Sequence, residues 1–173
     1  TAMSLREELV RNGPIFQSTS DTEVLLPLVA PSRYPTLLDR FIAALRMIEG
    51  AYSLVCMTTE GMIACRDPLG IRPLVMGLIG AEGQGAIVFA SETVAFDTVG
   101  AEFVREVEPG ELILADFNGN IRSHRPFGQA PARPGIFEHV YFSRPDSIFA
   151  GRSGYSVRKE IGVQLAVEAP AED

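Results

Sequence analysis

Short apolar runs that alternate with turn sequences fill residues 51–125, and this feature most constrains how the chain can fold. The runs cover residues 52–57, 62–65, 74–79, 86–90, 111–115 and 121–123. A polar segment ending in Gly61 separates the first two runs. Asn118-Gly119, a dipeptide favoured in two-residue hairpin turns, separates the last two. The spacing predicts successive antiparallel hairpins.

Helical patterns precede the predicted hairpins. Apolar residues recur at helical spacing over residues 5–10 and again over residues 38–48. Ser20 followed by Glu23 has the pattern of a capping box, which predicts a helix that starts at Asp21. Helices followed by antiparallel strands predict a layered α+β fold.

The remaining segments are predicted from local composition. Residues 15–20 are expected to form an extended run or short strand, and Ser91 is expected to cap a short helix. Proline and glycine dominate residues 126–135, which predicts a linker. Beyond it we expect a strand over residues 136–142 and a helix over residues 155–168.

The charge balance excludes several classes of partner. The chain has 22 Asp and Glu against 15 Lys and Arg, a net charge of -7 and an isoelectric point near 4.9. We expect no nucleic-acid or anionic-membrane partner, because phosphate contacts need clustered cations. No apolar run approaches the roughly 20 residues of a membrane span, and a signal-peptide pattern is missing. These observations predict a cytoplasmic protein.

The cysteines and histidines do not form a recognisable site in the sequence. Cys56 and Cys65 lie in apolar runs, where a free thiol behaves as a small hydrophobe, so we expect no disulfide. With His124 and His139 they do not match a metal-ligand spacing. Cys65 has no histidine nearby in sequence to act as its base, and His124 or His139 would have to approach it in the fold, so we do not favour it as a nucleophile.

Asp21 is the candidate binding residue. A carboxylate in the first turn of a helix could hold a substrate ammonium group. It could equally balance the helix dipole, which is the more common role and the one that the pattern alone favours.

Two Arg–Asp clusters are also candidates. The loop around Arg66, Asp67 and Arg72 could bind an anion, or it could hold itself together through Arg–carboxylate hydrogen bonds. We favour the structural role because two prolines stiffen the loop. Arg144 and Asp146 flank another proline and are expected to form a self-paired corner.

Motifs along nearly the whole chain resemble the amidophosphoribosyltransferase family. They are SLREEL at 4–9, IFQSTSDTEV at 15–24, GAYS at 50–53, RDPLGIRPL at 66–74, FASE at 89–92, VEPGE at 107–111, IFE at 136–138 and VYFSRPDS at 140–147. The RDP and ASE pieces are shared with other class II glutamine amidotransferases, such as asparagine synthetase. The segment 138–147 is specific to the purine enzyme.

The resemblance implies an N-terminal nucleophile (Ntn) hydrolase fold with αββα layers. Residues 1–125 would be part of the glutaminase domain, 126–135 the linker, and 136–173 the start of an α/β phosphoribosyltransferase domain. The family transfers the amide nitrogen of glutamine to phosphoribosyl pyrophosphate, giving 5-phosphoribosylamine. We expect a fragment that begins after the catalytic terminal cysteine and oxyanion-hole residues, so that it is inactive alone.

The resemblance also implies roles for particular residues and groups. Asp21 matches the acid that pairs with the α-ammonium group of glutamine, which reverses the preference from pattern alone. Mg²⁺ would act at a site outside this chain. Gly135 stands where many relatives have a cysteine, so an iron–sulfur cluster is not expected. A homo-oligomer is expected. The alternatives are a fragment of asparagine synthetase or a non-catalytic relative that only binds.

Overall fold

The computed structural model describes residues 2–80, 85–128 and 130–170. The chain divides into two compact units, Thr1–Gly50 and Ala51–Asp173, which are treated separately below. The division lies in the Glu49–Ala51 region that follows the last predicted N-terminal helix. The predicted boundaries at 125 and 135 do not coincide with it and stay predictions.

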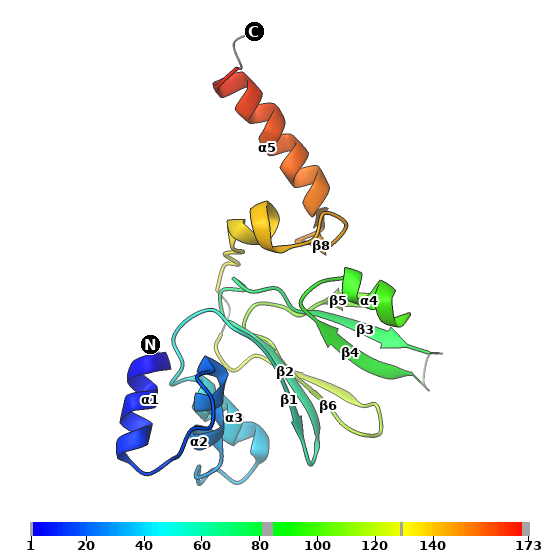
Figure 1. Ribbon diagram of the computed structural model, residues 1–173. Coiled ribbons are helices and arrows are strands. Elements are labelled where there is room, and N and C mark those ends of the chain that lie inside the picture. Colours follow the sequence, from blue (N-terminus) through cyan, green and yellow to red (C-terminus); the bar gives the residue numbers. More distant parts are fainter. Residues whose placement is uncertain (1, 81–84, 129, 171–173) are drawn as a thin grey trace. The chain divides into compact units, whose positions relative to one another are not determined.

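The first unit is helical. It contains α1 (Ala2–Arg11), the 3₁₀ helix η1 (Asp21–Val24), α2 (Leu25–Val29) and α3 (Leu37–Leu45) (Figure 1). Both helices expected from apolar spacing, α1 and α3, are confirmed. Thr36 caps α3, because its hydroxyl oxygen accepts a hydrogen bond from the Asp39 backbone N–H at 3.0 Å. Apolar side chains of η1, α2 and α3 are buried: Val24, Leu25, Val29, Phe41, Ala44 and Leu45.

One prediction for the first unit is wrong, and another is narrowed to one of its two alternatives. Residues 15–20 form neither a helix nor a strand, which excludes the short strand of the two expected alternatives. The expected capping box is also not formed, because the Ser20 side chain makes no capping hydrogen bond to the helix backbone. Its hydroxyl instead hydrogen-bonds the Thr22 hydroxyl at 2.7 Å, and Glu23 reaches residues further back in the chain. The predicted helix does start at Asp21; it begins as the 3₁₀ helix η1 and continues directly into α2 at Leu25.

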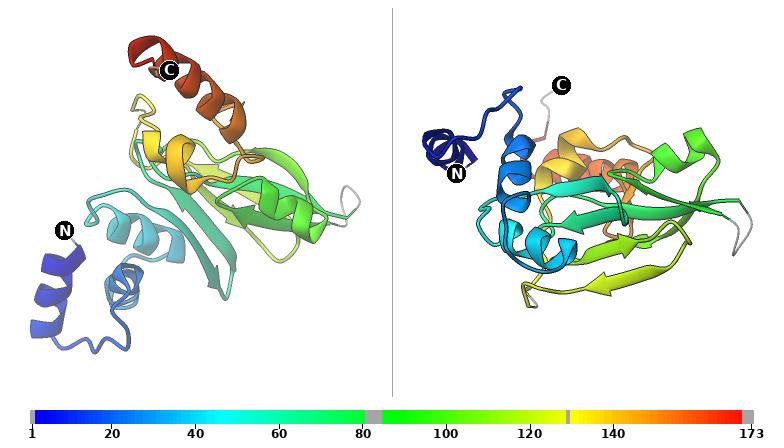
Figure 2. Two further views of the ribbon diagram at one scale, coloured as in Figure 1. Left: turned by 45° about the horizontal axis from the view of Figure 1, so that its top comes forward. Right: turned by 90° about the horizontal axis from the view of Figure 1, so that it is seen from below.

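Two antiparallel sheets form most of the second unit (Figure 2). One has the order β1-β2-β6-β7 and the other the order β4-β3-β5. The strands are β1 (Ser53–Thr58), β2 (Gly61–Arg66), β3 (Val75–Ile79), β4 (Ala86–Ala90), β5 (Glu102–Glu106), β6 (Leu112–Ala115) and β7 (Ile121–His124). All the predicted hairpins are confirmed, since β1 pairs with β2, β3 with β4, and β6 with β7.

Sequence reasoning missed β5. Its residues lack the alternation of apolar and polar side chains, and Phe103 and Val104 are each 50% exposed. Its pairing with β3 shifts register between Met76 and Gly77. A Cβ atom at Gly77 would lie 2.8 Å from the Glu102 carbonyl oxygen, so a glycine allows this close approach.

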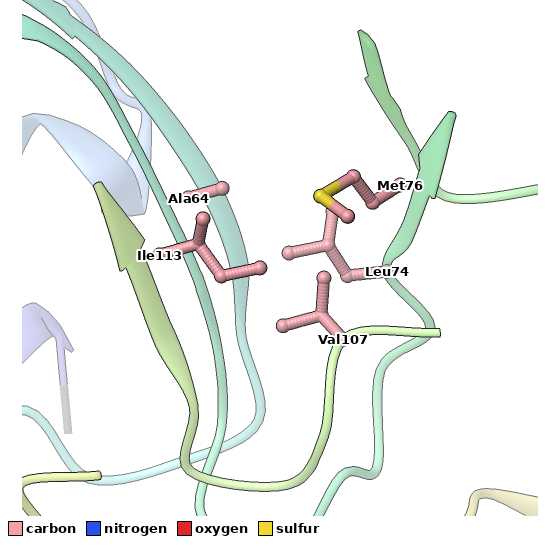
Figure 3. Packing of buried hydrophobic residues seen from close by; sticks show 5 residues of the cluster. All are labelled: Ala64, Leu74, Met76, Val107 and Ile113. Atoms are coloured by element: carbon pink, nitrogen blue, oxygen red, sulfur yellow. The ribbon is translucent and has the colours of Figure 1, made fainter. Parts of the chain in front are cut away.

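The core of the second unit lies between the two sheets. Ala64 on β2 and Ile113 on β6 face Met76 on β3, with Leu74 and Val107 beside them (Figure 3). Each of these side chains is at most 5% exposed. Burying one aliphatic side chain of this kind stabilises a fold by roughly 1.5–3 kcal/mol. Two sheets packed on a shared apolar layer confirm the predicted α+β layered class.

Short helices complete the second unit, and two details of their prediction are wrong. Thr93, not Ser91, occupies the N-cap position of α4 (Val94–Val99), and Gly100 ends the helix in the left-handed conformation. The predicted strand over 136–142 is a helical segment that includes the π-helix η2 (Glu138–Phe142). Its apolar side chains are mostly exposed, and none of the sheets formed by the described residues extends to this segment. A strand here would leave its backbone groups without a partner strand.

The C-terminal part of the second unit follows its prediction more closely. The short hairpin β8 (Ile148–Phe149) and β9 (Arg152–Ser153) leads into α5 (Gly154–Glu168), which confirms the predicted helix. Of the helix residues, Gly154 and Val157 are buried. The described part of the predicted linker has no helix or strand, although the Arg133 N–H donates to the Leu69 carbonyl at 2.7 Å.

Glu111, just before β6, carries a buried ionic network. Its carboxylate accepts two hydrogen bonds from Arg105, one from the Ser123 hydroxyl and one from the Glu108 backbone N–H, all within 2.8 Å. The side chain is only 2% exposed. Burial by itself would raise the pKa of Glu111, but these hydrogen bonds outweigh it and lower the pKa to about 2.

We therefore expect a specific acid sensitivity. The folded pKa of Glu111 lies below its unfolded value, so its contribution is complete above about pH 4.5 and is lost as the pH falls towards 2. Urea midpoints of the chain measured between pH 7 and pH 3 should fall less steeply for Glu111→Gln than for the unchanged protein. Equal slopes would contradict the role of this carboxylate.

Candidate functional site

The Asp21 carboxylate is exposed and opens the first turn of η1. Among the residues that the structure describes, none donates a hydrogen bond to it or forms an ion pair with it. A carboxylate in this state is available to an external cation. The role predicted for Asp21, binding of an ammonium group, stays a prediction that this geometry supports.

Glu23, two residues further on, is instead fully engaged. Its carboxylate accepts hydrogen bonds from the Gln17 N–H at 2.6 Å, from the Ser18 N–H at 2.9 Å and from the Ser18 hydroxyl at 2.6 Å. The hydrogen bond from Gln17, followed by those from Ser18, lowers the pKa of Glu23, so the side chain is ionised at neutral pH.

Arg6 on α1 contacts the same turn. Its guanidinium donates to the carbonyl oxygens of Ser18 and Ser20 and lies 4.0 Å from the Glu23 carboxylate. The guanidinium carbon is also 4.2 Å from the centroid of the Phe16 ring, a cation–π distance. Sequence reasoning missed both partners, because the pattern of Ser20 and Glu23 suggested a capping box.

Arg66 is a structural hub in the second unit. It is 4% exposed, and its guanidinium donates to the carbonyls of Arg72 at 2.7 Å, Val107 at 2.7 Å and Gly70 at 3.0 Å. A carboxylate oxygen of Glu106 lies 3.4 Å away. The donors point inwards at backbone carbonyls, so this arginine closes the loop and is not available to an external anion.

Asp67 organises the same loop from within. It is 1% exposed, and its carboxylate accepts hydrogen bonds from the backbone N–H groups of Leu69, Ile71 and Arg72, each at 3.0–3.1 Å. The structural role that we favoured is supported, although its expected chemistry is wrong. Asp67 binds backbone amides rather than arginine side chains.

Arg72 does not bind Asp67 through its side chain either. Its guanidinium pairs with Glu138 of η2 at 3.1 Å and lies 5.4 Å from the Phe142 ring centroid. This ion pair joins the loop to the segment 138–147.

The corner at Arg144 and Asp146 is self-paired as expected. The two side chains form a bidentate pair at 3.0 and 3.1 Å. The Glu92 carboxylate stabilises the corner, because it accepts hydrogen bonds from the Arg144 backbone N–H at 2.8 Å and the Ser147 hydroxyl at 2.6 Å. Neither this corner nor the Asp67 loop leaves a free charged group, so Asp21 remains the candidate binding residue.

Cys65 does not have the surroundings of a nucleophile. Cys65 is 1% exposed, and burial, with the nearby Cys56, raises the pKa of its thiol to about 12. Both cysteines are free thiols, as expected, and lie on the neighbouring strands β1 and β2. A thiol with such a pKa is a poor nucleophile at neutral pH.

We therefore expect the 173-residue chain, tested alone, to hydrolyse no glutamine. Glutamate release should equal that of a buffer blank, and iodoacetamide should alkylate Cys65 only after denaturation. Cys56, which is partly exposed, serves as the internal control for reagent access. Turnover that is abolished by alkylation would contradict the prediction.

The described residues offer little to a metal ion or a bilayer. Within residues 2–80, 85–128 and 130–170, no three His, Cys, Asp or Glu side chains are grouped so that they could hold a metal ion. In the same part of the chain, every helix is too short or too polar to cross a membrane. The expectations that Mg²⁺ acts at a site outside this chain and that an iron–sulfur cluster is absent stay predictions.

Comparisons with known proteins converge on one family. The family model described as "Glutamine amidotransferase domain" matches residues 2–98. The amidophosphoribosyltransferase of Rhizobium etli is 47% identical over 174 residues, which covers 98% of this chain and 34% of that protein. The chloroplastic amidophosphoribosyltransferase of Glycine max is 47% identical, over 98% of this chain and 29% of that protein. The chain thus spans about a third of the length of these curated relatives.

A solved structure is similar over nearly the whole chain. It is glutamine phosphoribosylpyrophosphate amidotransferase from Bacillus subtilis, complexed with ADP and GMP. The TM-score is 0.90 at 43% sequence identity, and the match covers 99% of this chain and 36% of that one.

Proposed function

The chain belongs to the glutamine amidotransferase family, and on that premise we propose that it forms part of an amidophosphoribosyltransferase. The enzyme would convert glutamine, water and phosphoribosyl pyrophosphate into glutamate, 5-phosphoribosylamine and pyrophosphate, as the first step of de novo purine biosynthesis. The observation that carries the proposal is the match to the Bacillus subtilis amidotransferase over 99% of the chain. The relatives reported above favour this activity over that of asparagine synthetase.

In this proposal Asp21 binds the α-ammonium group of glutamine. Its carboxylate is exposed and unpartnered among the described residues, and a charge-assisted hydrogen bond to an ammonium group typically contributes about 1.5–3 kcal/mol. Asp21 would orient the substrate, so that the side-chain amide faces the nucleophile. It has no part in bond cleavage.

The remaining chemistry would come from residues other than those of this chain. A terminal cysteine would attack the glutamine amide, with its own α-amine as the base, and release ammonia. Phosphoribosyl pyrophosphate would bind to a transferase domain that begins at residue 136. Mg²⁺ would be held in that domain, outside this chain.

The oligomeric state and the cellular location of the enzyme are part of the same proposal. We expect a homo-oligomer in the cytoplasm. Apolar side chains of η2 and α5 are exposed in the single chain, which supports burial in a larger assembly: Val140, Tyr141, Phe142, Tyr155, Val163, Leu165 and Val167.

The test uses a full-length enzyme that carries this segment. With glutamine and phosphoribosyl pyrophosphate, pyrophosphate release should depend on both substrates. With ammonium chloride in place of glutamine, the transferase step should still proceed. Pyrophosphate release that instead requires ATP and aspartate would replace the proposal with the asparagine synthetase alternative. Glutamine binding without either reaction would indicate the non-catalytic relative.

A further inference from the structure

The turn before Asp21 is held from two sides by opposite charges. The Glu23 carboxylate accepts hydrogen bonds from the N–H groups of Gln17 and Ser18. The Arg6 guanidinium donates hydrogen bonds to the carbonyl oxygens of Ser18 and Ser20. The Ser18 hydroxyl links the two, because it donates to Glu23 and accepts from the Ser20 N–H at 3.2 Å. The backbone that leads into Asp21 therefore has its direction set by side chains.

The same contacts determine which charges remain available. Arg6 is a cation close to the turn, and it is engaged by Glu23, by two carbonyl oxygens and by the Phe16 ring. Its Glu23 partner is ionised and only 18% exposed. Without the charge of Glu23, the Arg6 guanidinium would lose its anionic partner. Arg6 already donates to the Ser20 carbonyl, which directly precedes Asp21, so the Asp21 carboxylate would be an alternative partner.

We propose that Arg6 and Glu23 are positioning residues for glutamine recognition, which fix the turn and keep the Arg6 charge paired so that Asp21 stays free for the substrate ammonium group. This inference rests on the proposed role of Asp21. Neither residue touches the substrate; both act through the aspartate.

The first experiment replaces Glu23 with glutamine in a full-length enzyme that carries this segment. Glu23→Gln keeps the size of the side chain but removes its charge. We expect the KM for glutamine to rise about three- to tenfold, with kcat nearly unchanged. Activity with ammonium chloride should not change. The matched control is Glu8→Gln, which removes one negative charge from α1. The Glu8 side chain is exposed and forms no hydrogen bond or ion pair with the described residues.

A double-mutant cycle with Asp21→Asn separates positioning from general stability. If Glu23 acts through Asp21, Glu23→Gln should raise KM little further once Asp21 is already asparagine. An equal increase in both backgrounds would overturn the proposal. If Asp21→Asn itself leaves KM unchanged, the assignment of Asp21 fails. If Asp21→Asn raises KM and Glu23→Gln does not, only the present inference fails.

A second variant covers the case in which Glu23→Gln does not fold. Arg6→Lys keeps the positive charge but loses the planar fork that binds two carbonyls at once. We expect a smaller rise in the KM for glutamine, again with unchanged ammonia-dependent activity and again absent in the Asp21→Asn background. An unchanged KM for Arg6→Lys would then overturn the proposal.

Discussion

Replacing Arg66 with methionine should lower the free energy of unfolding of the chain by about 3–5 kcal/mol. The substitution leaves the carbonyl oxygens of Gly70, Arg72 and Val107 without their donor in a site where the side chain is 4% exposed. It also removes the cation next to Glu106. Methionine fills much of the volume but supplies no hydrogen bond, so the loss comes from unpaired polar groups. Urea denaturation followed by circular dichroism measures it.

The control for this prediction is Arg152→Met. Arg152 forms an ion pair with Glu160, but the two side chains are 49% and 67% exposed, so its loss should change stability by less than about 1 kcal/mol. A loss as large as that of Arg66→Met would mean that arginine removal in general, and not the buried hub, destabilises the chain. Arg66→Lys should fall between the two, because one ammonium group cannot reach three divergent carbonyls.

Replacing Asp21 with asparagine should raise the KM for glutamine roughly 10- to 100-fold in a full-length enzyme that carries this segment. Asparagine keeps the shape of the side chain but loses the charge that would pair with the substrate ammonium group. Because Asp21 has no partner among the described residues, the substitution breaks no internal contact, and thermal stability should be unchanged. Initial rates at varied glutamine concentrations give KM and kcat separately.

Asp97→Asn is the matched control for Asp21. Asp97 is likewise an exposed aspartate in the first turn of a short helix, α4. If Asp21 served only to balance a helix dipole, the two variants would behave alike, with small effects on stability and none on KM. A normal KM for Asp21→Asn would remove the only residue of this chain assigned to substrate binding.

The hairpins of the second unit were predictable because local chemistry decides them. Gly61 and Asn118-Gly119 permit tight turns, and the flanking apolar runs supply strands that a turn brings into register. The run over 136–142 has the same apolar composition, yet it includes a π-helix. No strand in the part of the chain that the structure describes pairs with its backbone, and composition alone does not reveal whether such a neighbour exists.

The candidate site was predictable only in part. The pattern around Asp21 suggested dipole compensation, and the resemblance to a family was needed to suggest substrate binding. Neither the local pattern nor the family resemblance predicted the contacts of Glu23 and Arg6 with the turn. Their contacts join residues 12 to 14 positions apart or run against the expected capping direction, so no short motif signals them.

The sequence by itself determined the helical N-terminal segment, the hairpin pairs and the layered α+β class, because spacing, turn residues and apolar periodicity act over a few residues. Tertiary structure alone decided three features: the addition of β5 to β3, the burial of Arg66 and Asp67, and the lack of a partner for Asp21 among the described residues. Each of these features depends on contacts between groups that are far apart in the sequence. Only the packing of the whole fold determines which of these groups form hydrogen bonds with one another.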